Sequence, residues 1–216
     1  MITEKELNEL RPKGLDGALW EELKFCHLPW HQLSVAITVK LPDHVLENYK
    51  KMALAARNKR IIILSGPTGT GKTVFGIRYI IRCLYEGIRP PIYLDCYSLR
   101  AIIDGRLGIE LDYHDTLRCY QTRLKHPFAV ERENFVDISE LPFHYGVIMI
   151  DDFGRQDFEA IWTLIEKIYS SGSRLILTTN IRPEEIDMEF PERVKGRLRE
   201  IGLLWVRGGE DLRAGR

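Results

Sequence analysis

The segment from Gly66 to Thr73 has the composition and spacing of a phosphate-binding loop. Its sequence, GPTGTGKT, matches the pattern GxxxxGK[ST] and lies between a predicted strand and a predicted helix. Glycines let the backbone approach phosphate oxygens closely, and the amides at a helix N-terminus point toward an anion. Lys72 adds a cation for the β and γ phosphates, and the Thr73 hydroxyl is a hard oxygen ligand for Mg²⁺. The predicted phosphate-binding residues are Gly66, Pro67, Thr68, Gly69, Thr70, Gly71, Lys72 and Thr73.

Two aspartates follow an apolar run later in the chain. Residues 147–150 are apolar and end at Asp151 and Asp152. Open α/β sheets bind their ligands at the carboxyl ends of their strands, so we expect these carboxylates beside the phosphate loop. Asp151 would hold Mg²⁺, directly or through water, and Asp152 would orient and deprotonate an attacking water. The alternative is that both aspartates only end a strand and cap the next helix.

A further apolar run, residues 175–177, ends in Thr178, Thr179 and Asn180. If its strand neighbours the one that ends at Asp151, then Thr179 or Asn180 would hydrogen-bond the γ phosphate or the attacking water. The alternative is that Asn180 simply begins a turn.

Cationic side chains gather near the C-terminus. A short predicted helix carries Arg193, Lys195, Arg197 and Arg199, and Arg213 follows the last predicted strand. One guanidinium could reach a phosphate in a neighbouring subunit while another acts within its own subunit. Taken alone, basic residues on a helix usually form a solvated face.

Short apolar runs alternate with helical patterns from residue 42 onward. Strands are predicted at 61–64, 91–96, 147–150, 174–179 and 203–207, and helices at 42–57, 73–86, 98–107, 113–125, 156–170 and 192–200. This alternation predicts an α/β domain over 42–216, with a five-stranded parallel sheet covered on both faces. Residues 1–41 lack sustained periodicity and are predicted to form an N-terminal arm with one or two short helices.

The composition excludes several classes of protein. The 216 residues include 31 Lys and Arg against 31 Asp and Glu, so a generally basic coat for nucleic acid is excluded. The N-terminus lacks the apolar run of a secretory signal, and no stretch of about 18 apolar residues could span a membrane. We therefore expect a soluble, cytoplasmic protein without a membrane partner. Four scattered cysteines without a CxxC pair argue against a disulfide framework or a zinc cluster.

Aromatic and basic residues interleave between the second and third predicted strands. They are Tyr113, His114, Arg118, Tyr120, Arg123, Lys125, His126 and Phe128. Single-stranded nucleic acid is bound by this combination, because cations follow the phosphates and rings stack on the bases. The candidate contacts are Arg118, Tyr120, Arg123 and Lys125. An amphipathic helix with an exposed basic face explains the same residues equally well.

The order of these features resembles the AAA+ ATPases of the bacterial helicase-loader type, the DnaC and DnaI proteins, and the related IstB transposition helpers. The matching segments, within residues 45–216, are GPTGTGKT at 66–73, VIMIDDFG at 147–154, RLILTTN at 174–180, ERVKGRLRE at 192–200 and LLWVRGGEDLR at 203–213. The resemblance implies a three-layer P-loop NTPase fold without a separate helical lid domain, and ATP and Mg²⁺ as cofactors.

The resemblance also implies a role for each candidate residue. Lys72 and Thr73 would form Walker A, and Asp151 and Asp152 Walker B. Thr179 or Asn180 would be sensor 1, Arg197 the arginine finger acting in a neighbouring subunit, and Arg213 sensor 2. Many ATPases of this class carry glutamate at the position of Asp152, and the shorter aspartate is expected to slow hydrolysis or require an extra water.

The function implied is an ATP-dependent helicase loader in replication initiation. It would hydrolyse ATP slowly at subunit interfaces of a homo-oligomer, contact single-stranded DNA and deliver a replicative ring helicase. One alternative is an IstB-like, ATP-switched adaptor for a transposase. A P-loop small-molecule kinase is less favoured, because paired aspartates suit water activation. The arm at 1–41, with Leu19, Trp20, Leu23, Phe25, Leu28 and Trp30, would either dock a helicase or, as we prefer, cover the ATPase core.

Overall fold

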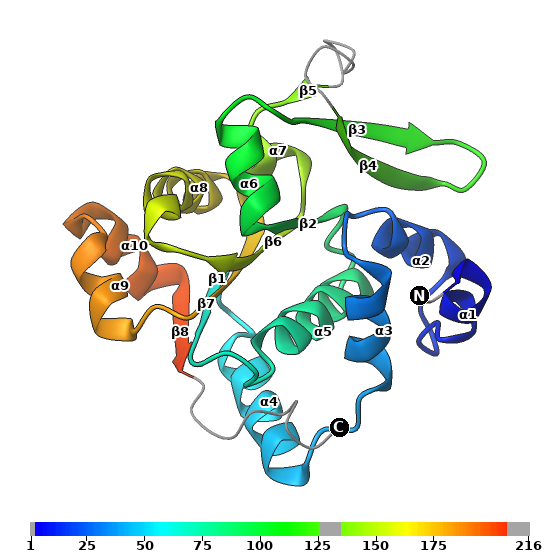
Figure 1. Ribbon diagram of the computed structural model, residues 1–216, viewed down its shortest axis with the longest axis horizontal. Helices are drawn as coiled ribbons and strands as arrows, with labels where there is room; N and C mark the ends of the chain where they lie inside the picture. Colours follow the sequence, from blue (N-terminus) through cyan, green and yellow to red (C-terminus); the bar gives the residue numbers. More distant parts are fainter. Residues whose placement is uncertain (1–2, 126–134, 207–216) are drawn as a thin grey trace.

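The computed structural model describes residues 3–125 and 135–206. In this part of the chain, five parallel strands form the central sheet in the order β2-β6-β7-β1-β8 (Figure 1). The strands are β1 (Ile61–Ser65), β2 (Pro91–Asp95), β6 (Val147–Phe153), β7 (Arg174–Thr179) and β8 (Gly202–Val206). The predicted strands, their parallel direction and the α/β class are therefore confirmed. β6 is longer than predicted and includes both aspartates.

Helices cover both faces of the sheet, because alternate residues of its buried strands point to opposite sides. Ile62 and Leu64 belong to an apolar cluster with α4 (Asp43–Ala55) and α5 (Lys72–Tyr85). Ile61 and Ile63 belong to a second cluster on the other face. The helices of that second face are α6 (Cys96–Ile103), α7 (Leu141–His144), α8 (Phe158–Ser171), α9 (Pro183–Glu189) and α10 (Glu192–Ile201).

The N-terminal arm packs on the α5 face of the sheet. Between residues 3 and 41 it forms three helices, one more than the upper number predicted: α1 (Glu4–Glu9), α2 (Gly17–Lys24) and α3 (Trp30–Thr38). Trp20, Leu23 and Leu28 are buried in the same apolar cluster as α5, and Leu19 and Trp30 pack against it. The arm therefore covers the core, and α3 runs beside α5 (Figure 1).

The helix predicted at 113–125 is wrong. This segment belongs to an antiparallel hairpin of β3 (Gly108–His114) and β4 (Cys119–Lys125), which β5 (Phe135–Val136) extends in the order β4-β3-β5. Tyr113 faces Tyr120 across the strands with ring centroids 5.0 Å apart, a pairing typical of antiparallel sheets. Cross-strand contacts of this kind are invisible to a helical-periodicity argument. Figure 1 shows the hairpin projecting away from the central sheet.

The length and polarity of the helices bear on whether any of them could cross a membrane. Within residues 3–125 and 135–206, the helices are all too short or too polar to cross a membrane.

Candidate nucleotide-binding site

The predicted phosphate loop connects β1 to α5. Gly69 and Gly71 have φ angles of 83° and 84°, a left-handed conformation that glycine adopts without strain. Gly71 is the residue immediately before α5, so the loop leads directly into the helix N-terminus. The loop amides and the positive end of the helix dipole therefore face the same side, as an anion site requires.

Lys72 lies folded against the loop. Its amine donates hydrogen bonds of 2.8 Å to the Gly66 and Pro67 carbonyls and of 3.0 Å to Asn180 Oδ1. The side chain is buried, yet its nitrogen remains at the cavity wall. The ammonium group is thus positioned where phosphate oxygens would replace these neutral acceptors.

Asp151 lies at the carboxyl end of β6 and is 7% exposed. Its carboxylate accepts hydrogen bonds from three hydroxyls: from Thr73 at 3.0 and 3.1 Å, from Tyr93 at 2.8 Å, and from Thr178. Lys72, Thr73 and Asp151 line the same cavity. The predicted partners Thr73 and Asp151 are therefore brought together.

A β-bulge explains how two consecutive aspartates both serve this edge of the sheet. The pairing of β6 with β7 shifts register between Ile150 and Phe153, and Asp152 has a φ angle of 58°. A left-handed conformation costs a residue other than glycine about 1–2 kcal/mol. The Asp152 amide donates to Thr178 Oγ1 at 2.8 Å, which holds the bulge. Bulges commonly re-aim side chains next to functional sites.

Asn180, rather than Thr179, lies at the cavity. Asn180 Nδ2 donates to Asp152 Oδ1 at 2.8 Å, while Asn180 Oδ1 accepts from Lys72. Thr179 is completely buried, and its hydroxyl donates to the Phe153 carbonyl at 2.8 Å. Of the two candidates for sensor 1, only Asn180 has a side chain that reaches the cavity.

Three polar residues near Asp151 were missed by the sequence analysis. Tyr93 and Thr178 donate to its carboxylate, and the Tyr93 hydroxyl is also 2.9 Å from Gln32 Oε1. Burial, followed by the charge of Asp151, raises the pKa of Tyr93 far above its usual range, so the phenol keeps its proton. Tyr93 gave a weak signal as a phenol between the apolar residues Ile92 and Leu94. Gln32 gave none.

A cavity of about 430 Å³ joins these groups. Its lining includes the polar side chains of Lys72, Thr73, Asp151, Asp152 and Asn180, those of His31 and Gln32 from α3, and several apolar side chains. The apolar wall comes from α3 and its following residues and from α5: Val35, Val39, Leu41, Val74 and Ile77. The cavity therefore suits a ligand with an anionic end and an apolar end.

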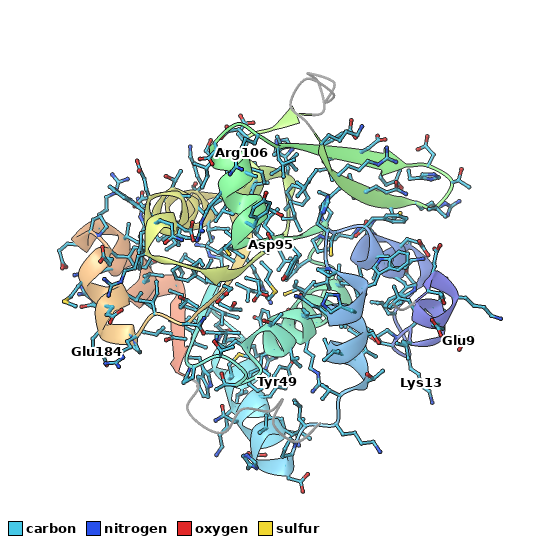
Figure 2. All side chains as sticks on the ribbon, in the orientation of Figure 1. Glu9, Lys13, Tyr49, Asp95, Arg106 and Glu184 are labelled. Carbon is cyan, nitrogen blue, oxygen red and sulfur yellow. The ribbon has the colours of Figure 1, made fainter. Side chains whose placement is uncertain are left out.

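Asp95, labelled in Figure 2, ends the neighbouring strand β2 and caps α6 through the Ser98 amide at 2.6 Å.

The oxygen atoms around Thr73 and Asp151 fit Mg²⁺. Within the described residues, no cluster of three His, Cys, Asp or Glu side chains could hold a metal ion unaided. Mg²⁺ is usually held by one or two protein oxygens together with substrate phosphates, so a single carboxylate and a hydroxyl are sufficient. Thr73 and Asp151 would hold the ion, as the sequence predicts.

Arg197 does not line this cavity in its own chain. It pairs with Glu166 of α8 and lies 4.9 Å from the centre of the Tyr169 ring. Arg193 pairs with the same glutamate at 2.6 Å. A function for Arg197 at a phosphate therefore requires another copy of the chain. Arg213 lies outside the described residues.

The candidate nucleic-acid residues lie on the hairpin. Arg118 is exposed in the turn, and Tyr120, Arg123 and Lys125 follow along β4. Lys125 pairs with Glu110 at 2.7 Å, and Arg123 donates to Gln121 at 3.2 Å. The candidates therefore lie on one hairpin rather than on a helix, and the alternation along β4 points Tyr120 to the face opposite Arg123 and Lys125. His126 and Phe128 lie outside the described residues.

Comparisons with known proteins identify the fold. No family model and no curated protein match the sequence. A structure from Streptococcus pyogenes serotype M3, named as a primosome component, is 15% identical with a TM-score of 0.59, over 93% of this chain and 99% of that one. DnaI is 11% identical with a TM-score of 0.56, over 89% and 99%. DnaA from Aquifex aeolicus, solved with AMPPCP bound, is 15% identical with a TM-score of 0.53, over 86% and 53%.

The chain thus spans nearly the whole of the first two structures and about half of the DnaA structure. At these identities the similarity establishes the fold. The P-loop NTPase fold implied by the resemblance to helicase-loader ATPases is therefore confirmed.

Proposed function

We propose that this chain, with the fold of DnaI and of the DnaA nucleotide-binding structure, is an ATPase that loads a ring helicase at the initiation of DNA replication. The observation that carries the proposal is the convergence of Lys72, Thr73 and Asp151 at one end of the cavity, with Asp152 beside them. This arrangement supports binding and hydrolysis of a nucleoside triphosphate. That the DnaA structure holds AMPPCP supports ATP as the nucleotide.

Each residue has a defined task in this mechanism. Lys72 exchanges its carbonyl and Asn180 partners for β- and γ-phosphate oxygens. Thr73 and Asp151 hold Mg²⁺, which supplies positive charge that neutralises the phosphates when bound. Asp152 orients and deprotonates the attacking water, and Asn180 contacts the γ phosphate. Asn180 donates to Asp152 Oδ1 and would help to orient this carboxylate.

Subunit contacts complete the proposed site. We assign Arg197 as the finger that reaches the phosphates of a neighbouring copy, leaving Glu166 when the copies assemble. Arg213 is assigned to sensor 2 by the resemblance alone. The hairpin residues Arg118 and Arg123, with the Tyr113–Tyr120 pair, are assigned to single-stranded DNA.

One alternative has an observation in its favour. The aspartate at position 152 has a shorter arm than the glutamate that many ATPases of this class carry, which favours slow hydrolysis. A slow ATPase suits an IstB-like adaptor, in which ATP controls assembly with a transposase. The two functions share the nucleotide site and differ in the partner.

The test compares Lys72→Ala and Arg197→Ala with the wild type, in ATP and Mg²⁺, with and without single-stranded DNA. Phosphate release and particle mass are recorded together. We expect Lys72→Ala to lose nucleotide binding, and Arg197→Ala to bind ATP but lose turnover and DNA-stimulated assembly. Lys59→Ala and Arg199→Ala are matched controls, since Lys59 bonds only the Glu200 carbonyl among the contacts described and Arg199 is exposed on α10. Normal hydrolysis by a monomeric Arg197→Ala protein would contradict the proposal.

A further inference from the structure

The hydroxyl of Tyr93 has a role that packing does not explain. Tyr93 is 2% exposed within the apolar cluster of β2, where phenylalanine would fill the same space. Burying a hydroxyl costs free energy unless the hydroxyl is hydrogen-bonded. The hydrogen-bond partners of the Tyr93 hydroxyl therefore indicate its role. Its nearest partner is Asp151 Oδ2, at 2.8 Å. Tyr93 thus fixes one oxygen of the carboxylate to which Mg²⁺ is assigned.

The second partner of Tyr93 comes from the N-terminal arm. Gln32, in the first turn of α3, has its side-chain amide 2.9 Å from the Tyr93 oxygen. A phenol has one proton, and the Asp151 carboxylate is the stronger acceptor. Tyr93 therefore donates to Asp151 Oδ2 in preference to Gln32 Oε1, which is a second acceptor within reach of the same proton. The hydroxyl of β2 thus contacts both α3 and β6.

The other end of α3 is attached to α5. Arg78 of α5 donates to the Ala36 and Val39 carbonyls, each at 2.8 Å. Val35, between these attachments, and Val39, which follows the helix, both line the cavity. The same helix therefore contacts the metal end of the site through Gln32 and lines the cavity along its length.

We propose that Tyr93 is a positioning residue for Asp151 and that Gln32 links it to the arm, so that docking of α3 and Mg²⁺-dependent nucleotide binding stabilise each other. This inference rests on the proposed ATPase function and deepens it by assigning the arm a part in the site. Energetic coupling between two sites is reciprocal. Removing the arm contact must therefore weaken Mg²⁺-nucleotide binding, and Mg²⁺-nucleotide must protect the arm.

The first test is Tyr93→Phe in the full chain. The affinity for the fluorescent nucleotide mant-ADP is measured with Mg²⁺ and with EDTA. Loss of an outer-shell partner typically weakens metal binding about 10–100-fold, so we expect about a tenfold loss with Mg²⁺ and little change in EDTA. Tyr145→Phe is the matched control, because its buried hydroxyl contacts Thr122, outside the cavity lining.

The second test is Gln32→Met, which keeps the length of the side chain and removes its amide. Hydrogen exchange of the α3 amides is followed with and without Mg²⁺ and mant-ADP. In the wild type we expect the complex to slow exchange in α3, and in Gln32→Met and Tyr93→Phe we expect most of this protection to be lost. Thr38→Val, on the same helix and bonded only to the Ser34 carbonyl among the described contacts, is the control.

The outcomes separate this inference from the function on which it rests. A wild type that binds no mant-ADP overturns both. A wild type that binds normally, with Tyr93→Phe showing the same Mg²⁺ dependence and α3 the same exchange with and without nucleotide, overturns the inference alone. If Tyr93→Phe fails to fold, Gln32→Met decides, because Gln32 is not part of the buried core.

Discussion

Two buried carboxylates in this molecule have opposite surroundings. Asp151 accepts hydrogen bonds from the hydroxyls of Thr73, Tyr93 and Thr178 and lies at the wall of a cavity. Glu22, on α2, is 1% exposed; its Oε1 accepts from the Tyr120 amide at 3.1 Å and pairs with Arg89 at 2.6 Å. In the described residues its Oε2 has no hydrogen-bond partner.

The surroundings of Asp151 suit a cation-binding site, and those of Glu22 suit a structural contact between elements of the fold. Around Asp151 the hydroxyls orient the carboxylate and leave its negative charge for a cation. At Glu22 the charge is compensated within the chain by Arg89, and the contact joins α2 to the hairpin. Desolvation is the largest effect on Glu22 and raises its pKa above the usual range.

The largest effect is expected at Asp151, and an exposed aspartate of the hairpin receives the same substitution for comparison. Asp151→Asn removes the charge that Mg²⁺ requires, and we expect phosphate release to fall about 100-fold or more. Asp112→Asn makes the matching change at an exposed position of β3, outside the cavity lining, and should leave turnover within about twofold. Phosphate release with saturating ATP and Mg²⁺ measures both.

Thermal unfolding of the two variants shows whether loss of activity reflects loss of structure. An Asp151→Asn protein that folds and still hydrolyses ATP at the wild-type rate would remove Asp151 from the mechanism.

The nucleotide site was predictable where the chemistry restricts residue types. The loop at 66–73, the aspartates of β6 and the polar end of β7 are each defined by a short local stretch of sequence, and the structure has all three at one edge of the sheet. The roles of Tyr93 and Gln32 were not predictable, because they depend on contacts between β2, α3 and β6. No local pattern encodes a hydrogen bond between residues 58 or 61 positions apart.

The prediction of a helix at 113–125 was wrong for a related reason. The aromatic and basic residues of this segment are compatible with a helical face, and the choice is made by pairing of β3 with β4 and by contacts to the arm. The Thr122 amide donates to the Phe25 carbonyl, and the Leu124 amide to His27 Nε2. Strand propensity depends strongly on such neighbours, which a single segment does not reveal.

An intermediate effect is expected on the hairpin. The double variant Arg118→Ala/Arg123→Ala should weaken binding of single-stranded DNA about tenfold and leave mant-ADP binding unchanged. Each lost phosphate contact should also reduce the salt dependence of binding, by about 0.7 in the slope of log K against log salt. Fluorescence anisotropy with a labelled oligonucleotide at several salt concentrations measures both quantities.

Arg106→Ala is the control for this experiment. Arg106 is exposed and pairs with Asp104 at 2.8 Å. It lies just past the C-terminal end of α6, whereas Asp95 lies at the N-terminal end of that helix (Figure 2). An unchanged affinity in the double variant, or an equal loss in Arg106→Ala, would remove the hairpin from the DNA contact.

The smallest effect concerns Glu22 and depends on pH. Because the pKa of Glu22 is raised in the folded state, the folded protein binds more protons than the unfolded chain as pH falls from neutral toward the usual value for glutamate. The wild type therefore gains stability from this group as pH falls and loses it as pH rises through the raised pKa. Glu22→Gln lacks the titration and retains an acceptor for the Tyr120 amide.

We expect Glu22→Gln to raise Tm at pH 8 by about 2–4 °C, the shift that 1 kcal/mol causes in a domain of this size, and the advantage to shrink toward pH 5. Glu9→Gln, an exposed carboxylate on α1, is the control and should show no such pH dependence. A Tm difference that grows as pH falls would mean that Arg89 stabilises the charged form more than burial opposes it. Glu22 would then resemble a paired surface carboxylate, and the contrast with Asp151 would rest on the cavity alone.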